Sequence, residues 1–408
     1  MGPSEGDELM GGRRGGLLRE EKNGRYEPSP VELLFDLVFV FAATQLSVFL
    51  LKHLDLTGLL EAFVLLLAVW WFWDHIVWTT NWFNPDKWPV RLVLFVAMGL
   101  GLVMSTSILG AFEDLGVVFV VGYLGMHVLR GAFIIVAAWR ESRELAMNLV
   151  RASIWVAISS PLWIIGAVAD PQQRVWWWLA AIALNYFGPA VRYWLPVIGR
   201  SPVESWAVSG HHISERAQLF VIIALGESVL VMGFTFRGDW MNPASAFALF
   251  ATLVGTLLLW LIYFNNTAGV AQKFFEKARE SGRLAANAYT YLHLVIVAGI
   301  VLVAVGDELV LAHPDDPLDP STAAVVFGGP ALYILGNLLF KHSVGYRWLK
   351  SNIIGILVLI LLFLLTTALG SLTPLIASWL ANAVILAVVI GEEVAHRRSP
   401  AVGANLAP

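Results

Sequence analysis

The sequence predicts an all-α, polytopic membrane protein with about twelve transmembrane helices, and three observations lead to this prediction. The 408 residues are 58% hydrophobic and only 14% charged, with a mean hydropathy of +0.71, whereas soluble domains are about 25% charged. Apolar runs of roughly 20 residues, the length that crosses a bilayer, recur along the chain. Lysine and arginine gather in alternate connections between those runs. We therefore expect the lipid bilayer to be the main partner of this chain.

The apolar runs follow one another with short breaks. The first begins at Val31, after a polar segment that lacks the apolar core and cleavage site of a signal peptide. The breaks contain turn-forming residues such as Asn84-Pro85-Asp86 and Asp170-Pro171. The expected transmembrane helices span residues 31–51, 57–80, 90–110, 116–139, 147–168, 175–197, 213–236, 244–265, 285–310, 322–341, 348–370 and 374–392.

The distribution of basic residues orients these helices. If the N-terminus lies in the cytoplasm, cytoplasmic segments hold 22 of the 26 lysines and arginines, and the opposite side holds only Lys52, Arg174 and Arg237. Positively charged connections stay in the cytoplasm, so we expect both termini there. The net charge of −4 without a long basic run argues against a nucleic-acid partner. The sequence leaves the oligomeric state open.

Several kinds of chemistry are excluded. The absence of cysteine removes disulfides, thiolate nucleophiles and cysteine-ligated metals. No P-loop, dinucleotide-binding fingerprint, G-x-S-x-G or zinc pattern occurs. The pair His211 and Glu215, four residues apart, is a weak metal signal, and a solvated helix start is the better interpretation. We therefore expect no cofactor, no metal site and no enzyme activity.

Twelve helices divide into two sets of six, and the sequence carries a faint duplication. The first and seventh helices each place a glutamate at the predicted cytoplasmic mouth, Glu32 and Glu215. Because six is even, such halves would be parallel repeats about an axis along the membrane normal, a plan common in transporters. The expected organisation is a cytoplasmic tail 1–30, a first half 31–205, a second half 206–396 and a C-terminal tail 397–408.

Ionisable residues inside the predicted helices are the main functional candidates, because charge in the bilayer is costly. Glu32 and Asp36 are four residues apart and share a helix face. We interpret Asp36 and Glu227 as paired carboxylates of a proton or ion path, with Arg130 as the counter-charge. The alternative is that Asp36 or Glu227 pairs with Arg130 only to hold helices together. The other candidates for relays or hydrogen-bond partners on the path are His127, His293, Asp74 and His75.

The residues at the predicted cytoplasmic mouth have a simpler interpretation. Glu32 and Glu215 are expected to cap helix starts near Arg25 and Arg216. The second helix carries an unusual concentration of tryptophan. We expect these rings to anchor the helix at the interface, with a ligand-stacking role open to the deepest members of the set Trp70, Trp71, Trp73, Trp78, Trp82 and Trp88.

Three strings resemble signatures of a known family. The run Val31-Glu-Leu-Leu-Phe-Asp-Leu-Val-Phe-Val-Phe-Ala-Ala-Thr-Gln-Leu-Ser47 is similar to the first motif of the bacterial low-temperature-requirement A (LtrA) family, with Leu34 where many members have Phe. The run from Glu215 to Ser228 resembles the second, and Ala288-Tyr-Thr-Tyr-Leu-His293 resembles a third. The resemblance implies a bacterial inner-membrane protein and brings no biochemical activity. The acidic residues of its motifs match Glu32, Asp36, Glu215 and Glu227.

Three functional hypotheses follow. The first is a secondary transporter, coupled to protons, in which Asp36 and Glu227 titrate during the cycle. The second is an ion channel with its pore between the halves and a constriction at Phe35 and Phe39. The third is a membrane or lipid-handling enzyme. The sequence does not identify the transported ion or small molecule.

Overall fold

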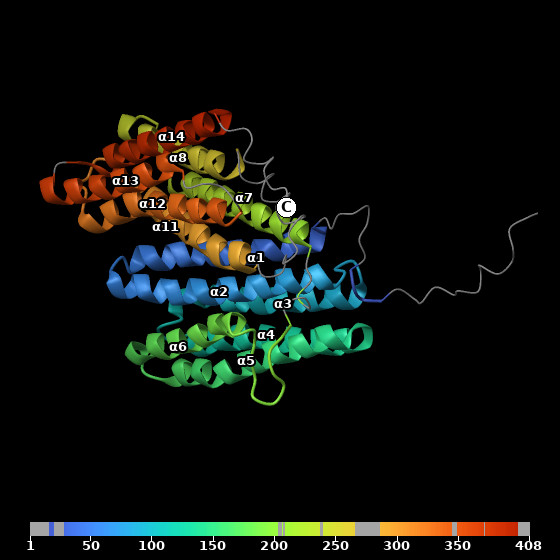
Figure 1. Ribbon diagram of the computed structural model, residues 1–408. Helices are drawn as coiled ribbons and strands as arrows, with labels where there is room; N and C mark the ends of the chain where they lie inside the picture. The colour runs from blue at the N-terminus through green and yellow to red at the C-terminus, as the bar shows by residue number, and fades with distance from the viewer. Residues whose placement is uncertain are drawn as a thin grey trace, which may run out of the picture.

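The computed structural model describes residues 16–19, 28–202, 206, 209–236, 240–265, 286–344, 349–370 and 372–398. Within these ranges the chain forms twelve α-helices and a few short turns (Figure 1). The helices are α1 (Pro30–Lys52), α2 (Leu56–Trp82), α3 (Trp88–Thr106), α4 (Gly116–Glu141), α5 (Arg143–Val168), α6 (Pro171–Ala190), α7 (Gly210–Thr235), α8 (Pro243–Phe264), α11 (His293–Ala312), α12 (Pro320–Ser343), α13 (Lys350–Leu369) and α14 (Pro374–Arg398).

Eleven of these helices are long and apolar enough to cross a membrane, and α6 is the exception in the described chain. The predicted all-α, polytopic fold is therefore confirmed. The lipid-facing surface is visible on α13, where Leu357, Leu361 and Leu364 are each more than half exposed. The predicted tails lie mostly outside the described residues, as do Arg25, Arg237 and the basic connection 273–283.

The helix boundaries differ from the predicted ones where capping residues act. The predicted helix 175–197 begins instead at Pro171, because the Asp170 carboxylate accepts the Gln172 backbone N–H at 3.0 Å. It ends at Ala190, shortly before Arg192 and Tyr193 adopt left-handed φ angles of 56° and 49°. The predicted helix 90–110 ends at Thr106 and continues as the 3₁₀ turn η1 (Ile108–Gly110).

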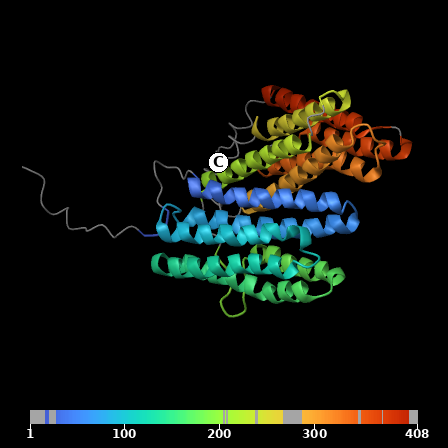
Figure 2. The ribbon, with the colours of Figure 1, turned by 180° about the vertical axis from the view of Figure 1, so that it is seen from behind.

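The helices form two groups that meet along α1, α2, α7 and α11. Figures 1 and 2 show α4, α5 and α6 on one side of the bundle and α8, α13 and α14 on the other. Within the first group α1 packs on α2 and α3, α3 on α4, α4 on α5, α5 on α6, and α2 on α6. The corresponding pairs also pack in the second group: α7 on α8 and α11, α11 on α12, α12 on α13, α13 on α14, and α8 on α14. In that group α14 also packs on α12 and α11, contacts that have no close counterpart between α6 and α4 or α3.

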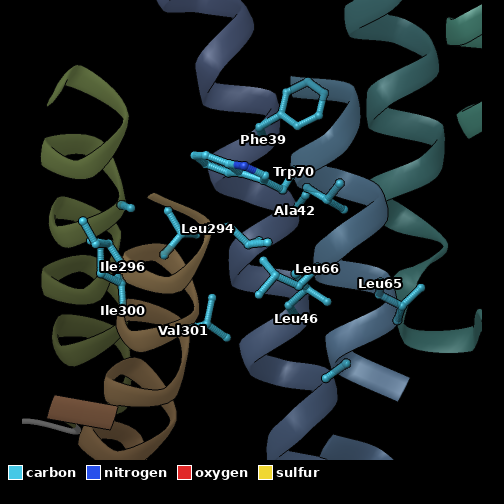
Figure 3. Close-up of a cluster of buried hydrophobic side chains, with 14 of the residues drawn as sticks. Phe39, Ala42, Leu46, Leu65, Leu66, Trp70, Leu294, Ile296, Ile300 and Val301 are labelled. Atoms are coloured by element: carbon cyan, nitrogen blue, oxygen red, sulfur yellow. The ribbon is translucent and has the colours of Figure 1, made fainter. Parts of the chain in front are cut away.

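The two groups are joined by an apolar core. Figure 3 shows Leu46 of α1 and Trp70 of α2 across from Leu294 and Val301 of α11, with Phe39 of α1 above Trp70. Glycines allow the closest approach within the second group, where a Cβ on Gly299 of α11 would lie 2.6 Å from the Tyr333 nitrogen of α12. Small residues at such crossings are the usual means of tight packing between membrane helices.

Candidate functional site

A buried ionic cluster joins α1 and α7. The Arg216 guanidinium donates to both carboxylate oxygens of Asp36, from Nε at 3.0 Å and from Nη2 at 2.5 Å. The Trp73 indole N–H of α2 donates to the same carboxylate at 2.7 Å. Arg216 and Asp36 are completely buried. Bidentate pairs of this kind are strong and fix geometry, so this pair sets the position of α7 against α1.

Glu32 is the second acid of the cluster. Its Oε1 accepts from Arg216 Nη1 at 2.9 Å and lies 2.7 Å from His212 Nε2. Its Oε2 accepts the Ser29 backbone N–H at 2.8 Å, so Glu32 also closes the capping box at the start of α1. The sequence-based expectation that Glu32 caps a helix start is confirmed, but the residue does more, because the same carboxylate binds α7.

His212 connects this cluster to α2. Asn81 Nδ2, which can only donate, lies 3.2 Å from His212 Nδ1. His212 Nε2 faces both the Glu32 carboxylate at 2.7 Å and Arg19 Nη1 at 3.0 Å, so this ring lies between an acid of α1 and a cation of the N-terminal segment. Arg19 Nη1 donates to the Thr80 carbonyl oxygen at 2.8 Å and lies 3.5 Å from Glu32. The cluster thus brings the guanidinium groups of Arg19 and Arg216 and the His212 imidazole around the carboxylates of Glu32 and Asp36.

The predicted role of Arg130 as counter-charge to Asp36 is wrong. Asp36 of α1 meets Arg216 because α1 and α7 are neighbours, whereas Arg130 belongs to α4, which packs on α2, α3 and α5. Asp36 and Glu227 are also not a contacting pair. Glu227 accepts the Thr44 hydroxyl at 2.9 Å, and Thr44 lies about 12 Å beyond Asp36 along the helix axis.

The remaining candidates are dispersed. Glu215 lies 3.5 Å from His211 in the same helix. His293 lies 2.6 Å from the Tyr263 hydroxyl. Both ring nitrogens of His127 lack a hydrogen-bond partner in the described part of the chain, and the ring packs against Phe72 and Tyr123. The His127 ring also lies edge-on to the His75 ring, with 5.3 Å between the ring centroids, so His127 is part of an aromatic layer and forms no hydrogen bond among the described residues.

Phe35 and Phe39, the constriction candidates, pack into the core. Their ring centroids are 4.8 Å apart, and Phe39 stacks on Phe72 at 5.8 Å. Both side chains are at most 1% exposed, and neither lines a described cavity. The structure gives these rings a packing role.

A cavity of about 850 Å³ lies beside the ionic cluster, on another face of α2. We call it the aromatic cavity, because seven of its described lining residues carry aromatic rings: Trp71, Trp78, Trp82, Tyr186, Tyr193, Trp206 and Tyr291. Its volume falls in the range of small-molecule sites, about 300–1,000 Å³. Trp71, Trp78 and Trp82 of the tryptophan set on α2 line this cavity, and the ligand-stacking role left open for the deepest of these rings stays a prediction.

Three polar side chains from the predicted path line the aromatic cavity: Asp74, His75 and Arg130. Asp74 Oδ1 accepts from the Thr290 hydroxyl at 2.6 Å and from the Trp78 indole at 3.3 Å. His75 Nδ1 lies 2.7 Å from the Trp71 carbonyl oxygen and donates to it, because a carbonyl only accepts. The neutral ring therefore offers Nε2 as an acceptor. Asp74 and Arg130 form no ion pair within 4 Å.

Both helix groups contribute to the aromatic cavity. Thr290 and Tyr291 belong to η2 (Ala286–Leu292), a π-helical turn that leads into α11. Such turns are rare and occur often at functional sites. The Trp70 indole donates to the Thr290 carbonyl oxygen at 2.5 Å, which fixes this turn against α2.

Sequence reasoning missed part of the cavity wall. Tyr186, Tyr193, Trp206 and Tyr291 come from elements that are distant in sequence, and Arg192 and Arg200 lie in the connection after α6. The apolar run 175–197 predicted a helix through Arg192 and Tyr193, so it gave no sign that these two residues leave the helix and line a cavity. No group of three or more His, Cys, Asp or Glu that could hold a metal occurs among the described residues.

These features define a polytopic helical membrane protein that holds charged residues and a ligand-sized cavity within its bundle. The chain belongs to the bacterial low temperature requirement A protein (LtrA) family, whose sequence model matches residues 28–390. It is 36% identical over 385 residues to uncharacterized protein RA0937 of Rhizobium meliloti (strain 1021), covering 93% of this chain and 92% of that protein. No solved structure matches the chain.

Proposed function

We propose that this protein is a proton-coupled secondary transporter of the bacterial inner membrane, with both termini in the cytoplasm and its substrate in the aromatic cavity. The observation that supports the proposal is the contact between Asp74 and Thr290, because it brings a carboxylate buried in the bundle to a cavity lined by both helix groups. Transporters place their substrate sites near the interface of their repeats and beside interrupted helices.

The arrangement of the two groups supports a repeat of the halves 31–205 and 206–396. Every close helix pair named for α1 to α6 has a counterpart in α7 to α14, although α14 packs on more neighbours than α6 does. The contacts of Glu32 with Arg216 and of Thr44 with Glu227 show that α1 and α7 run in the same direction. A parallel repeat requires this direction for its two first helices.

The proton-carrying group is Asp74 in this proposal, in place of Asp36 and Glu227. The Asp36 carboxylate is already engaged by two donors from Arg216 and one from Trp73, and it lines no described cavity. Asp74 has no cation within ion-pair distance among the described residues, and its Oδ2 has no hydrogen-bond partner there. Asp74 can therefore gain and lose a proton as the cavity fills and empties, with His75 Nε2 as a second acceptor.

The test uses purified protein in proteoliposomes with a pH-sensitive dye in the lumen. We expect imposed pH or potassium gradients to drive proton movement with wild type, and Asp74→Asn to abolish it while eluting as a folded particle. Asp86→Asn changes an exposed aspartate in the same way and should keep the flux.

Other outcomes would replace the proposal. Potassium flux that rises without saturation would identify a channel. Chemical change of the lipids without a gradient would identify an enzyme. Wild-type liposomes that behave like empty ones under both gradients, with and without added organic acid, would refute proton-coupled transport.

A further inference from the structure

We infer that the aromatic cavity binds an amphipathic organic anion, a carboxylic acid with an aromatic or apolar body whose acid group pairs with Arg130. This inference deepens the proposed function, because it names the substrate class of the same cavity. It rests on three observations: the hydrogen bonds of the buried arginines, a comparison between the two helix groups, and the charges of the cavity lining.

Three arginines are buried in the described chain: Arg130, Arg174 and Arg216. Arg174 donates to backbone carbonyls with Nε and both terminal nitrogens, the shortest bond being 2.7 Å to Glu113. Arg216 likewise uses Nε and both terminal nitrogens on its acids. Arg130 donates only from Nε, to Thr79 Oγ1 at 2.6 Å and to the His75 carbonyl oxygen at 3.0 Å. Its terminal nitrogens, the fork that binds carboxylates, have no hydrogen-bond partner among the described residues.

The second helix group shows how this chain neutralises a buried cation permanently. Lys341 of α12 lies at 2.6 and 2.7 Å from the two carboxylate oxygens of Glu392 of α14. It also donates to the Ile262 carbonyl oxygen at 3.1 Å. Arg130 lies on α4, the fourth helix of the first group, where α6 has no acidic residue and does not pack closely on α4. The space beside Arg130 is the aromatic cavity instead.

A buried guanidinium without a counter-charge is costly. A ligand carboxylate supplies that charge and matches the planar fork of the guanidinium in two parallel hydrogen bonds. Arg192 and Arg200 also line the cavity and are exposed, so they attract anions from solution. Three arginines against the single carboxylate of Asp74 give the cavity a net positive charge.

The rest of the lining selects the body of the ligand. Seven aromatic side chains face the cavity, with Leu149 and Ala152 between them. Apolar and aromatic surface gains most from burial against such walls. Aromatic walls also attract organic cations, so the charge of the ligand is the property that the test must decide.

The experiment measures binding to the full chain in detergent by calorimetry, with three probes that share one aromatic body. The probes are 2-naphthoate, its neutral isostere 2-naphthamide, and the cation 2-naphthylmethylammonium. We expect 2-naphthoate to bind about 10- to 100-fold more tightly than the amide, the value of one hydrogen-bonded charge. Arg130→Gln should weaken 2-naphthoate binding by the same factor and leave amide binding unchanged.

Matched variants separate the site from general charge effects. Arg91→Gln removes an exposed arginine outside the cavity and should change nothing. Arg200→Gln removes a charge at the exposed part of the lining and should weaken the acid by a smaller factor. Asp74→Asn should leave acid binding equal or tighter, whereas it would weaken a bound cation.

The inference is overturned if the amide or the cation binds as tightly as the acid, or if a folded Arg130→Gln protein keeps its affinity for 2-naphthoate. The comparison of acid and amide needs no variant, so misfolding of Arg130→Gln leaves it decisive. Binding of 2-naphthoate without proton flux would support the anion site and refute proton-coupled transport. Proton flux without binding of 2-naphthoate would support transport and refute the anion site.

Discussion

Arg216 and Asp36 form a fully buried pair that links the seventh helix to the first, at 2.5 Å between Nη2 and Oδ1. The same guanidinium also holds Glu32 at 2.9 Å. Arg216 of α7 thus binds two acids of α1 and connects the two helix groups. Disruption of this pair should therefore lower the stability of the folded protein.

The first prediction compares the two partners of this pair. Arg216→Met leaves two carboxylates without their main counter-charge and should destabilise the protein by about 3–5 kcal/mol. Asp36→Asn leaves Arg216 paired with Glu32 and should cost less. Thermal unfolding in detergent measures both. Arg91→Gln, which removes an exposed pair, should stay within about 1 kcal/mol of wild type. Equal losses for Arg216→Met and Arg91→Gln would contradict this account.

The second prediction concerns Lys341 and Glu392. Lys341→Met strands a buried carboxylate that Asn352 also contacts at 2.8 Å, and should cost about 3–5 kcal/mol. The double variant Lys341→Met with Glu392→Gln removes both charges and should recover much of that loss. A double-mutant cycle on unfolding temperatures measures the coupling. Additive effects of the two changes would show that the pair contributes nothing as a pair.

The third prediction tests the approach of α11 and α12. Gly299→Ala places a Cβ 2.6 Å from the Tyr333 nitrogen, so the helices must separate at a cost of about 1–3 kcal/mol. Gly328→Ala provides the control, because no atom lies within 4 Å of its Cβ. Alanine there should stabilise α12 by up to about 1 kcal/mol. Unfolding temperatures measure both changes in stability, and we expect a decrease for Gly299→Ala and an increase for Gly328→Ala. Changes of the same sign would be evidence against this packing.

The fourth prediction follows from Asp319, the N-cap of α12. Burial raises the pKa of this carboxyl, but hydrogen bonds from Ser321 and Thr322 lower it more, so the pKa lies below its usual range. A depressed folded-state pKa stabilises the protein above the unfolded-state pKa of about 3.9, and this contribution disappears as the pH falls through the folded-state pKa. Asp319→Ala should therefore cost about 0.5–1 kcal/mol at neutral pH.

The same variant gives the control for that pH dependence. The difference in unfolding temperature between wild type and Asp319→Ala should shrink as the pH is lowered below 4, because the protonated cap accepts fewer hydrogen bonds. A difference that is constant from pH 7 to pH 3 would mean that the carboxylate charge contributes nothing to the cap.

Much of the fold could be predicted because the bilayer imposes length and polarity on each helix. The twelve predicted helices all occur, although several ends moved: α6 begins earlier, where Asp170 caps it, and α3 ends earlier, at Thr106, before a 3₁₀ turn. Only the α1 side of the ionic cluster could be predicted from the sequence. Glu32 and Asp36 were recognised as one face, and the matching spacing of His212 and Arg216 on α7 is the signal that would have completed it.

The aromatic cavity could not be predicted as a site, since its wall depends on lateral packing that periodicity does not encode. Asp74, His75 and Arg130 were singled out one by one, but only the packing of α4 on α2 brings them to one cavity. Tyr193 reaches it through a left-handed backbone after α6, a conformation that no helix pattern announces.

The common direction of α1 and α7 has a topological consequence. Two helices that cross a bilayer the same way must be separated by an odd number of crossings. Between them lie α2, α3, α4, α5 and α6, and the first four alone would turn α7 upside down relative to α1. We infer that α6 crosses the membrane although its composition alone does not qualify it. The direction of α7 therefore identifies α6 as a membrane-spanning helix that its hydropathy alone does not identify. This short helix, which carries Arg174, is then the sixth crossing of the first group.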